Sequence, residues 1–223
     1  MKRNVLVSGV IVALFVGVIG AVLAFAPDRG SGGPGGGGGG GGGAVDAATL
    51  VRENSHRLQT AADGKVTVVE FLDFECEACR AAYPVVEDLR AKYEGKVTFV
   101  LRYFPIPSHQ NSMNAAVAVE AAAQQGKLEP MYKKMYDTQA QWGEQQESRA
   151  PLFRQFAQEL GLDLAAYDKA VADPATQKRV EADRNDGVAL GVQGTPTFFL
   201  NGTMIQPQSV QDFEAKIDAA LAK

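Results

Sequence analysis

The chain has two cysteines, Cys76 and Cys79, which stand three positions apart in the stretch FECEAC. Two thiols at this spacing could form a structural disulfide, contribute to a metal site or act as a redox-active dithiol. A disulfide that closes so short a loop stabilises a fold by only about 2 kcal/mol, against about 4 or more for a long loop. A structural zinc site needs four ligands, and neither His56 nor His109 has a partner at ligand spacing. We therefore expect a redox-active dithiol, with no metal and no other cofactor.

The dithiol lies where an apolar strand passes into a helix. Residues 65–74, KVTVVEFLDF, are β-branched, aromatic and apolar at both odd and even positions, which predicts a strand buried on both faces. Residues 76–95 then have helical spacing and end at a glycine. Because a helix N-terminus favours a thiolate, we expect Cys76 to be the exposed nucleophile and Cys79, one turn inside, to be the resolving thiol.

Acidic residues surround the first cysteine. Glu75 precedes Cys76, and Glu77 and Ala78 separate it from Cys79. Like charge disfavours a thiolate, so the two glutamates are expected to raise the pKa of Cys76, against the effect of the helix terminus. Glu75, Glu77 and Ala78 are thus the residues expected to tune the redox strength of the dithiol.

A third glutamate, Glu70, interrupts the predicted strand six residues before Cys76. One interpretation is a carboxylate at a strand edge that faces water. The other is a buried acid or base beneath the dithiol, whose pKa is raised by burial and which moves the proton of Cys79 during exchange.

The stretch QGTPTFF, residues 193–199, places a proline at the start of a strand. Proline cannot donate to a sheet ladder, so it marks a strand start, an edge or a cis bond. A cis bond between Thr195 and Pro196 would leave backbone free to pair with an extended peptide.

The remaining pattern predicts an α/β fold. Residues 96–106 read as a second strand, and about 108–190 as a run of helices. Strand character returns in 196–205, where Asn-Gly at 201–202 predicts a hairpin turn, and 209–223 form a closing amphipathic helix. This order predicts a mixed sheet with helices on its faces.

Two groups inside the helical run have less certain roles. His109 is interpreted as a surface histidine at a helix start, with a contact near the active site as the alternative. Apolar side chains at helical spacing predict a buried core, with an apolar substrate surface as the alternative for some of them. They are Met131, Tyr132, Met135, Tyr136 and Trp142.

In combination, these motifs resemble the DsbA-like branch of the thioredoxin superfamily. The matching pieces are VVEFLDFECEAC, the helical insertion and GVQGTPTFFLNG, and the likeness covers residues 48–223. The resemblance implies a thioredoxin-like fold, with the insertion between a β-α-β half and a β-β-α half. The chain departs from the well-known oxidants of the family, which have Pro-His between their cysteines, because it has Glu-Ala.

The resemblance also implies roles for single residues. Cys76 is implied as the nucleophile and Cys79 as the resolving thiol, with Glu70 as the buried acid. Thr195 and Pro196 correspond to a cis-proline loop that faces the dithiol and binds substrate. The partners implied are reduced exported proteins as substrates and a membrane oxidase that regenerates the disulfide.

The N-terminus predicts export. After the basic lead of residues 1–4, residues 5–26 carry no charge, and about 33 Å of helix would cross a bilayer. We expect a single-pass anchor, with a cleaved signal peptide as the alternative because residues 24–26 read AFA. The early positive charges predict a cytoplasmic N-terminus and an extracytoplasmic catalytic domain. The glycine-rich stretch 27–47 is expected to be a flexible linker.

Charge and motif together predict the function. The net charge is −4 and no basic block lies outside the extreme N-terminus, which argues against a nucleic-acid partner. We expect a membrane-anchored protein disulfide oxidoreductase that acts as an oxidase and is less oxidising than the strong oxidant at about −120 mV. The reductase or isomerase direction, and a redox-silent peptide-binding module with a thioredoxin fold, are the alternatives.

Overall fold

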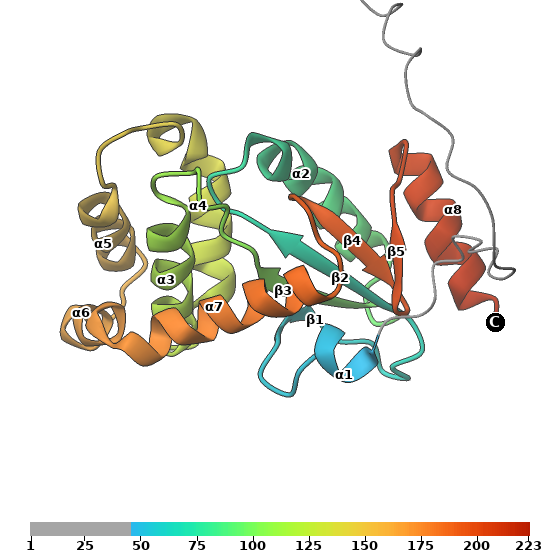
Figure 1. The fold of residues 1–223 in the computed structure, drawn as a ribbon. Helices are drawn as coiled ribbons and strands as arrows, with labels where there is room; N and C mark the ends of the chain where they lie inside the picture. Colours follow the sequence, from blue (N-terminus) through green and yellow to red (C-terminus); the bar gives the residue numbers. More distant parts are fainter. Residues whose placement is uncertain (1–45) are drawn as a thin grey trace, which may run out of the picture. The chain divides into compact units, whose positions relative to one another are not determined.

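The computed structural model describes residues 46–223, which form a five-stranded sheet with helices on both faces (Figure 1). The strands are β1 (His56–Gln59), β2 (Thr67–Leu72), β3 (Thr98–Tyr103), β4 (Thr197–Leu200) and β5 (Thr203–Ile205). Their order across the sheet is β1-β3-β2-β4-β5. β2 and β3 are parallel and the other neighbours are antiparallel, so the mixed sheet expected from the sequence is confirmed.

The helices fall into three groups along the chain. α1 (Ala47–Leu50) precedes the sheet, α2 (Glu77–Lys92) connects β2 to β3, and α8 (Val210–Leu221) closes the chain. The other five lie between β3 and β4: α3 (Ser112–Ala123), α4 (Leu128–Trp142), α5 (Ala150–Glu159), α6 (Leu164–Ala172) and α7 (Pro174–Ala189). They form the helical insertion that the sequence predicts.

β2 is the central strand and is buried on both faces, as predicted from its composition. Side chains alternate along a strand, so Val68 and Leu72 lie on the same face as Glu70. Val69 and Phe71 lie on the opposite face. The first face is covered by α2 and α8, and the second by α1 and α7 (Figure 1).

The predicted apolar cluster of the insertion is confirmed as core. Each of its side chains is at most 3% exposed, namely Met131, Tyr132, Met135, Tyr136 and Trp142. Tyr132 and Tyr136 contact Phe74, in the turn before the dithiol, with ring centroids 6.2 and 5.2 Å away. The insertion therefore packs directly behind the active-site turn.

The edge strand β1 was not predicted from the sequence. Its four residues, HRLQ, are mostly polar and half-buried, so they show neither the alternation nor the apolar run that indicates a strand. The segment becomes a strand because β3 offers it a free edge, where His56 pairs with Leu101.

α7 crosses the sheet at a glycine. A Cβ atom at Gly187 would lie 2.7 Å from the ring of Phe104 and 3.0 Å from that of Phe71. Contacts this short do not occur for real side chains, so glycine is needed for α7 to approach the sheet.

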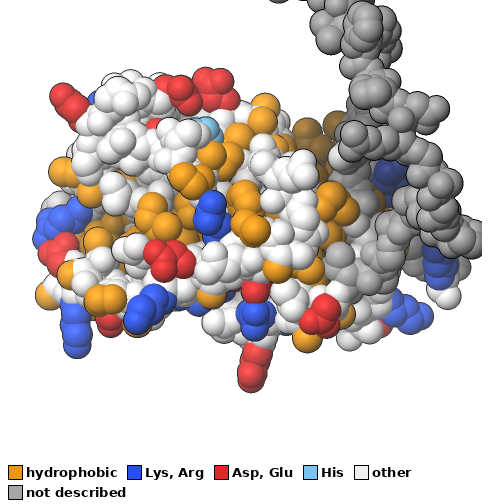
Figure 2. Space-filling model, viewed as in Figure 1, with side chains coloured by type: hydrophobic (Ala, Val, Ile, Leu, Met, Phe, Trp, Pro, Cys, Tyr) orange, Lys and Arg blue, Asp and Glu red, His pale blue; other side chains and the backbone are white. Residues whose placement is uncertain are grey.

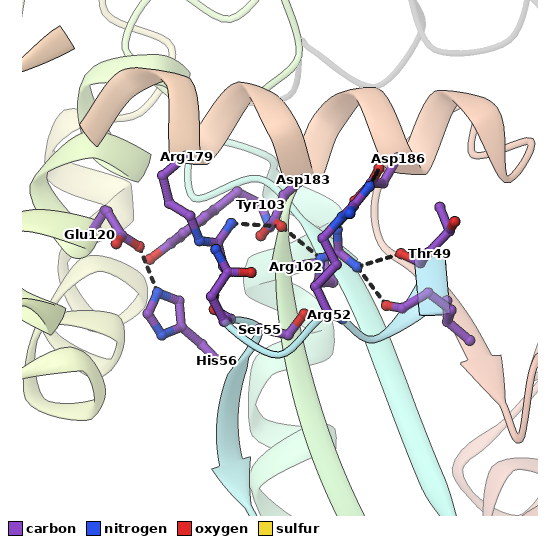
Figure 3. Close-up of polar contacts among 12 residues, drawn as sticks. Thr49, Arg52, Ser55, His56, Arg102, Tyr103, Glu120, Arg179, Asp183 and Asp186 are labelled. Carbon is purple, nitrogen blue, oxygen red and sulfur yellow. Dashed lines mark hydrogen bonds and ion pairs between the residues drawn. The ribbon is translucent and has the colours of Figure 1, made fainter. Parts of the chain in front are cut away.

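A buried charge cluster holds α7 and α1 against β3 (Figure 3). Arg102 of β3 is fully buried and donates to Asp183 at 2.8 Å and to Asp186, both on α7. Its guanidinium also donates to the carbonyl oxygens of Thr49 and Leu50, at 2.9 and 2.6 Å. One side chain therefore joins three elements that are far apart in the sequence.

Three further pairs extend this cluster (Figure 3). Arg52 binds Asp186, and Arg179 binds Asp183 at 2.6 Å. His56 contacts Glu120 of α3 at 2.6 Å, which links β1 to the insertion.

The predicted anchor, residues 5–26, and almost all of the predicted linker lie outside the described residues. Within residues 46–223 no helix is both long enough and apolar enough to span a membrane. α1 begins at Ala47, the last residue of the predicted linker.

Candidate active site

β2 and α2 place the two cysteines through a short turn. Cys76 is the N-cap residue of α2, and Cys79 lies within the first turn. The Cys76 amide donates to the carbonyl oxygen of Asp73 at 3.2 Å. The buried side chain of Gln139, on α4, donates to the carbonyl oxygens of Phe74 and Cys76 at 2.7 and 2.9 Å. These hydrogen bonds hold the turn against α4.

The predicted cis bond between Thr195 and Pro196 is present, and it faces the dithiol. The Cys76 sulfur lies 3.4 Å from the carbonyl oxygen of Thr195. The N-terminal end of α2 and the start of β4 thus meet at one edge of the sheet (Figure 1). Thr195 and Pro196 are only partly buried, so this backbone is accessible beside the nucleophile.

Both thiols are buried, so the expectation of an exposed Cys76 is wrong, but their pKa values are shifted in opposite directions. Cys76 is 8% exposed, and its pKa is lowered to about 5 by a hydrogen bond from the Cys79 thiol, with further contributions from Thr195 and the backbone amides of Ala78 and Cys79. Cys79 is fully buried, and burial raises its pKa well above the usual value. At neutral pH, Cys76 is therefore a thiolate and Cys79 a thiol.

The expected rise in the pKa of Cys76 is not found, because hydrogen bonds to the sulfur, that of Cys79 above all, outweigh the effect of burial. Glu75 is turned away from the solvent and accepts a hydrogen bond from the amide of Asn111 at 2.6 Å. Burial raises the pKa of Glu75 itself. Glu77 and Ala78 are exposed. A tuning role for these three residues stays a prediction.

Glu70 is buried, so the interpretation as a water-facing carboxylate is wrong. Its side chain is on the α2 face of β2, and the residue is 6% exposed. Burial, with the charges of Glu87 and Cys76, raises its pKa to about 8. The group is therefore mostly protonated at pH 7, and its role as the acid for Cys79 stays a prediction.

Replacing Glu70 by glutamine is expected to stabilise the protein while slowing exchange. The folded state holds this proton up to about pH 8, whereas an ordinary glutamate loses it near pH 4.5, so stability falls as the pH rises from about 4.5 to 8. Glu70→Gln removes that loss and should raise the free energy of unfolding by about 4 kcal/mol at pH 8. Oxidation of dithiothreitol by the disulfide should slow by about tenfold or more, because Cys79 loses its acid.

Urea unfolding at pH 5 and pH 8, together with stopped-flow kinetics, measures both effects. The matched control is Glu77→Gln, which changes an exposed carboxylate and should shift the stability by no more than about 0.5 kcal/mol. A Glu70→Gln protein that keeps the wild-type slope of stability against pH would contradict the assignment.

Sequence analysis missed two residues that support the nucleophile, Asp73 and Gln139. Asp73 is 1% exposed and follows β2 directly; a carboxylate at the end of a buried strand was the available signal. His109, interpreted mainly as a surface residue, contacts Asp73 at 2.7 Å. The alternative, a contact near the active site, is the one that the structure supports.

Within residues 46–223, no three histidine, cysteine, aspartate or glutamate side chains cluster closely enough to hold a metal ion. The chemistry that this site can perform with its own groups is thiol–disulfide exchange.

Comparison with known proteins agrees with this geometry. The family model described as thioredoxin matches residues 54–219. A thioredoxin-like oxidoreductase from Silicibacter pomeroyi DSS-3 is 26% identical, with a TM-score of 0.66 over 80% of this chain and 99% of that one. α-DsbA1 from Wolbachia pipientis is 19% identical, with a TM-score of 0.68 over 78% and 94%. BdbD from Bacillus subtilis is 18% identical, with a TM-score of 0.64 over 74% and 92%.

The curated relatives are much longer proteins. A Na⁺/H⁺ antiporter NhaA 3 from Salinispora tropica is 32% identical over 180 residues, which are 80% of this chain and 26% of the antiporter. An NhaA from Herminiimonas arsenicoxydans is 36% identical over 144 residues, which are 65% and 22%. The chain thus spans about a quarter of the length of the curated relatives that it matches.

Proposed function

This chain belongs to the thioredoxin family, with a DsbA-like fold, and we propose that it is a thiol–disulfide oxidoreductase that oxidises exported proteins. The observation that carries the proposal is the contrast between the two sulfurs. Cys76 has a pKa of about 5 and faces the Thr195 carbonyl oxygen, whereas the pKa of buried Cys79 is raised.

The proposed reaction starts from the Cys76–Cys79 disulfide. A substrate thiolate attacks the Cys76 sulfur, the bond to Cys79 breaks, and Cys79 leaves with a proton from Glu70. The second substrate thiol loses its proton and attacks the substrate sulfur of the mixed disulfide. Cys76 then leaves as a thiolate. Two electrons pass to the protein. One of the two substrate protons replaces the proton that Glu70 gave to Cys79, and the other is released.

The low pKa of Cys76 supports the oxidising direction. A thiol with a low pKa leaves faster, so the mixed disulfide resolves readily toward oxidised substrate. A stable thiolate also stabilises the reduced protein, which makes its disulfide a better oxidant.

The redox potential is expected to lie between those of thioredoxin and DsbA. Their nucleophilic cysteines have pKa values of about 7 and 3.5, with potentials of about −270 and −120 mV. The value of about 5 for Cys76 falls between them. Equilibration with glutathione measures the potential. A potential at or below about −270 mV would indicate a reductase instead. A potential at or above about −120 mV would contradict the prediction that the protein is a weaker oxidant than DsbA.

The substrates are proposed to be unfolded or extended chains. The partly exposed backbone at Thr195 can pair with an extended segment, as peptides do in strand addition. Figure 2 shows apolar side chains in the middle of one face, with charged side chains mainly around its edge. Apolar surface of this kind suits contact with unfolded protein.

We place the enzyme outside the cytoplasm, held by the predicted anchor of residues 5–26 and the glycine-rich linker. The support is the sequence pattern: a basic lead, an uncharged stretch long enough to cross a bilayer, and a dithiol that needs an oxidising compartment. A membrane oxidase is proposed to regenerate the disulfide.

Oxidative refolding of reduced ribonuclease tests the function. The oxidised chain should accelerate recovery of ribonuclease activity in stoichiometric amounts, and catalytically when an oxidant regenerates the disulfide. A recovery rate equal to that without the protein would overturn the proposal.

A further inference from the structure

His109 is held beside the nucleophile by a buried carboxylate. Its Nδ1 lies 2.7 Å from Oδ2 of Asp73, whose side chain is fully buried, while the imidazole is 24% exposed. The ring lines an open groove between the β3–α3 loop and α7. His109 can therefore exchange protons with the solvent while Asp73 keeps it in place.

Asp73 connects this histidine to Cys76. Its carboxylate accepts hydrogen bonds from the amides of Glu75 at 2.9 Å and Ile106 at 3.0 Å, and its carbonyl oxygen accepts one from the amide of Cys76 at 3.2 Å. The carboxylate therefore has a fixed position in the turn that carries the nucleophile. The imidazole of His109 is linked to this turn through its hydrogen bond with the Asp73 carboxylate.

The charges around the imidazole favour its protonated form. Asp73, Glu75 and Cys76, in the β2–α2 turn, act on it by their negative charges. From α7, Glu181 and the oppositely charged Arg184 line the same groove. Burial opposes the charge, but the bond to Asp73 and the charges of Asp73, Cys76 and Glu75 raise the pKa of His109. One of these charges, the Cys76 thiolate, exists only while the dithiol is reduced.

We propose that His109 and Asp73 form a redox-linked proton site, in which the imidazole binds a proton more tightly when the Cys76–Cys79 disulfide is reduced and less tightly when it re-forms. Interactions between two sites are reciprocal. If the thiolate stabilises the imidazolium, the imidazolium must stabilise the thiolate by the same free energy. His109 would thus help to set the oxidising strength, although it lies outside the dithiol motif.

The proton balance follows from the proposed reaction, on which this inference rests. Two substrate thiols give up two electrons and two protons. The electrons break the Cys76–Cys79 bond, one proton stays on Cys79, and the other is released. Near the midpoint of His109, part of that released proton is taken up by the imidazole. It returns to the solvent when the protein is oxidised again.

Nuclear magnetic resonance of the two histidines tests the proposal directly. The full chain is titrated in its oxidised and reduced forms, and the Cε1–H signals are assigned with His56→Gln. The midpoint of His109 should be higher in the reduced form by about half a unit or more. His56, which contacts Glu120 of α3 at 2.6 Å, is the internal control, and its signal should not depend on the redox state.

Two variants separate charge from conformation. In reduced Cys76→Ser protein the thiolate is absent without a disulfide, so the His109 midpoint should match that of the oxidised wild type. In His109→Gln protein the thiolate absorbance of Cys76 at 240 nm should titrate about half a unit higher than in wild type, whereas His56→Gln should leave it unchanged.

Equal His109 midpoints in the two redox states, or a lower midpoint in the reduced form, would overturn the proposal. This result is distinguishable from failure of the proposed function, because the titration needs no protein substrate. If the His109 midpoint shifts between the redox states but ribonuclease is not oxidised, only the proposed function is contradicted. If ribonuclease is oxidised but the midpoint does not shift, only the proton site is contradicted.

Discussion

Replacing Cys76 by serine is expected to slow disulfide exchange by about a thousandfold or more, to the rate without enzyme. Three features of Cys76 suit the sulfur that forms the mixed disulfide with substrate: a pKa of about 5, a place at the N-terminus of α2 and a contact with Thr195 beside the cis-proline loop. Cys79 cannot replace it, because that sulfur is fully buried and its pKa is raised. Stopped-flow oxidation of a reduced peptide measures the rate.

The matched variant Cys79→Ser should behave differently. Its Cys76 remains a thiolate that can attack a substrate disulfide, but no second thiol is present to release the product. A mixed disulfide with substrate should therefore accumulate and be visible by mass spectrometry. If Cys76→Ser instead traps substrate and Cys79→Ser does not, the two roles are reversed.

Replacing Arg102 by methionine is expected to lower the free energy of unfolding by about 3–5 kcal/mol. The guanidinium is fully buried between Asp183 and Asp186, and it also satisfies the carbonyl oxygens of Thr49 and Leu50. Methionine fills a similar volume, but it has no positive charge to compensate the buried carboxylates of Asp183 and Asp186. Urea unfolding followed by circular dichroism measures the loss.

A surface pair provides the control for this prediction. Arg154 binds Asp168 with two hydrogen bonds of 2.7 and 2.8 Å, but both side chains are about half exposed. Arg154→Met should therefore cost no more than about 1 kcal/mol. Equal losses for Arg102→Met and Arg154→Met would show that burial does not set the strength of the cluster.

The parts of the active site that depend on neighbouring residues in the chain can be predicted from the sequence. A strand apolar on both faces and a helix start at Cys76 predict the position of the dithiol, because each depends on neighbours in the chain. The proline at 196 left a strand start, an edge or a cis bond open, and the cis-proline loop that faces the dithiol was implied by the family resemblance. Glu70 could be recognised as a candidate site residue in the same way, because a charged residue is unusual inside a strand that is buried on both faces.

Contacts between distant segments could not be predicted in this way. Glu75 was expected to oppose the thiolate, but its direction depends on the amide of Asn111, 36 residues away. The contact of His109 with Asp73 and the buried position of Arg102 likewise depend on where the β3–α3 loop and α7 pack. The strand β1 forms only because β3 leaves an edge free.

The attachment of α1 to Arg102 has a mechanical consequence. Any tension applied to the chain ahead of Asp46 enters the domain at α1, whose last carbonyl groups are bound by a side chain of β3. The load then passes through Arg52 and Arg102 into Asp186 on α7. α2 and the turn before it lie outside that path. When the N-terminus is pulled, Cys76 and Cys79 should therefore keep their relative positions until the ion pairs of the charge cluster break.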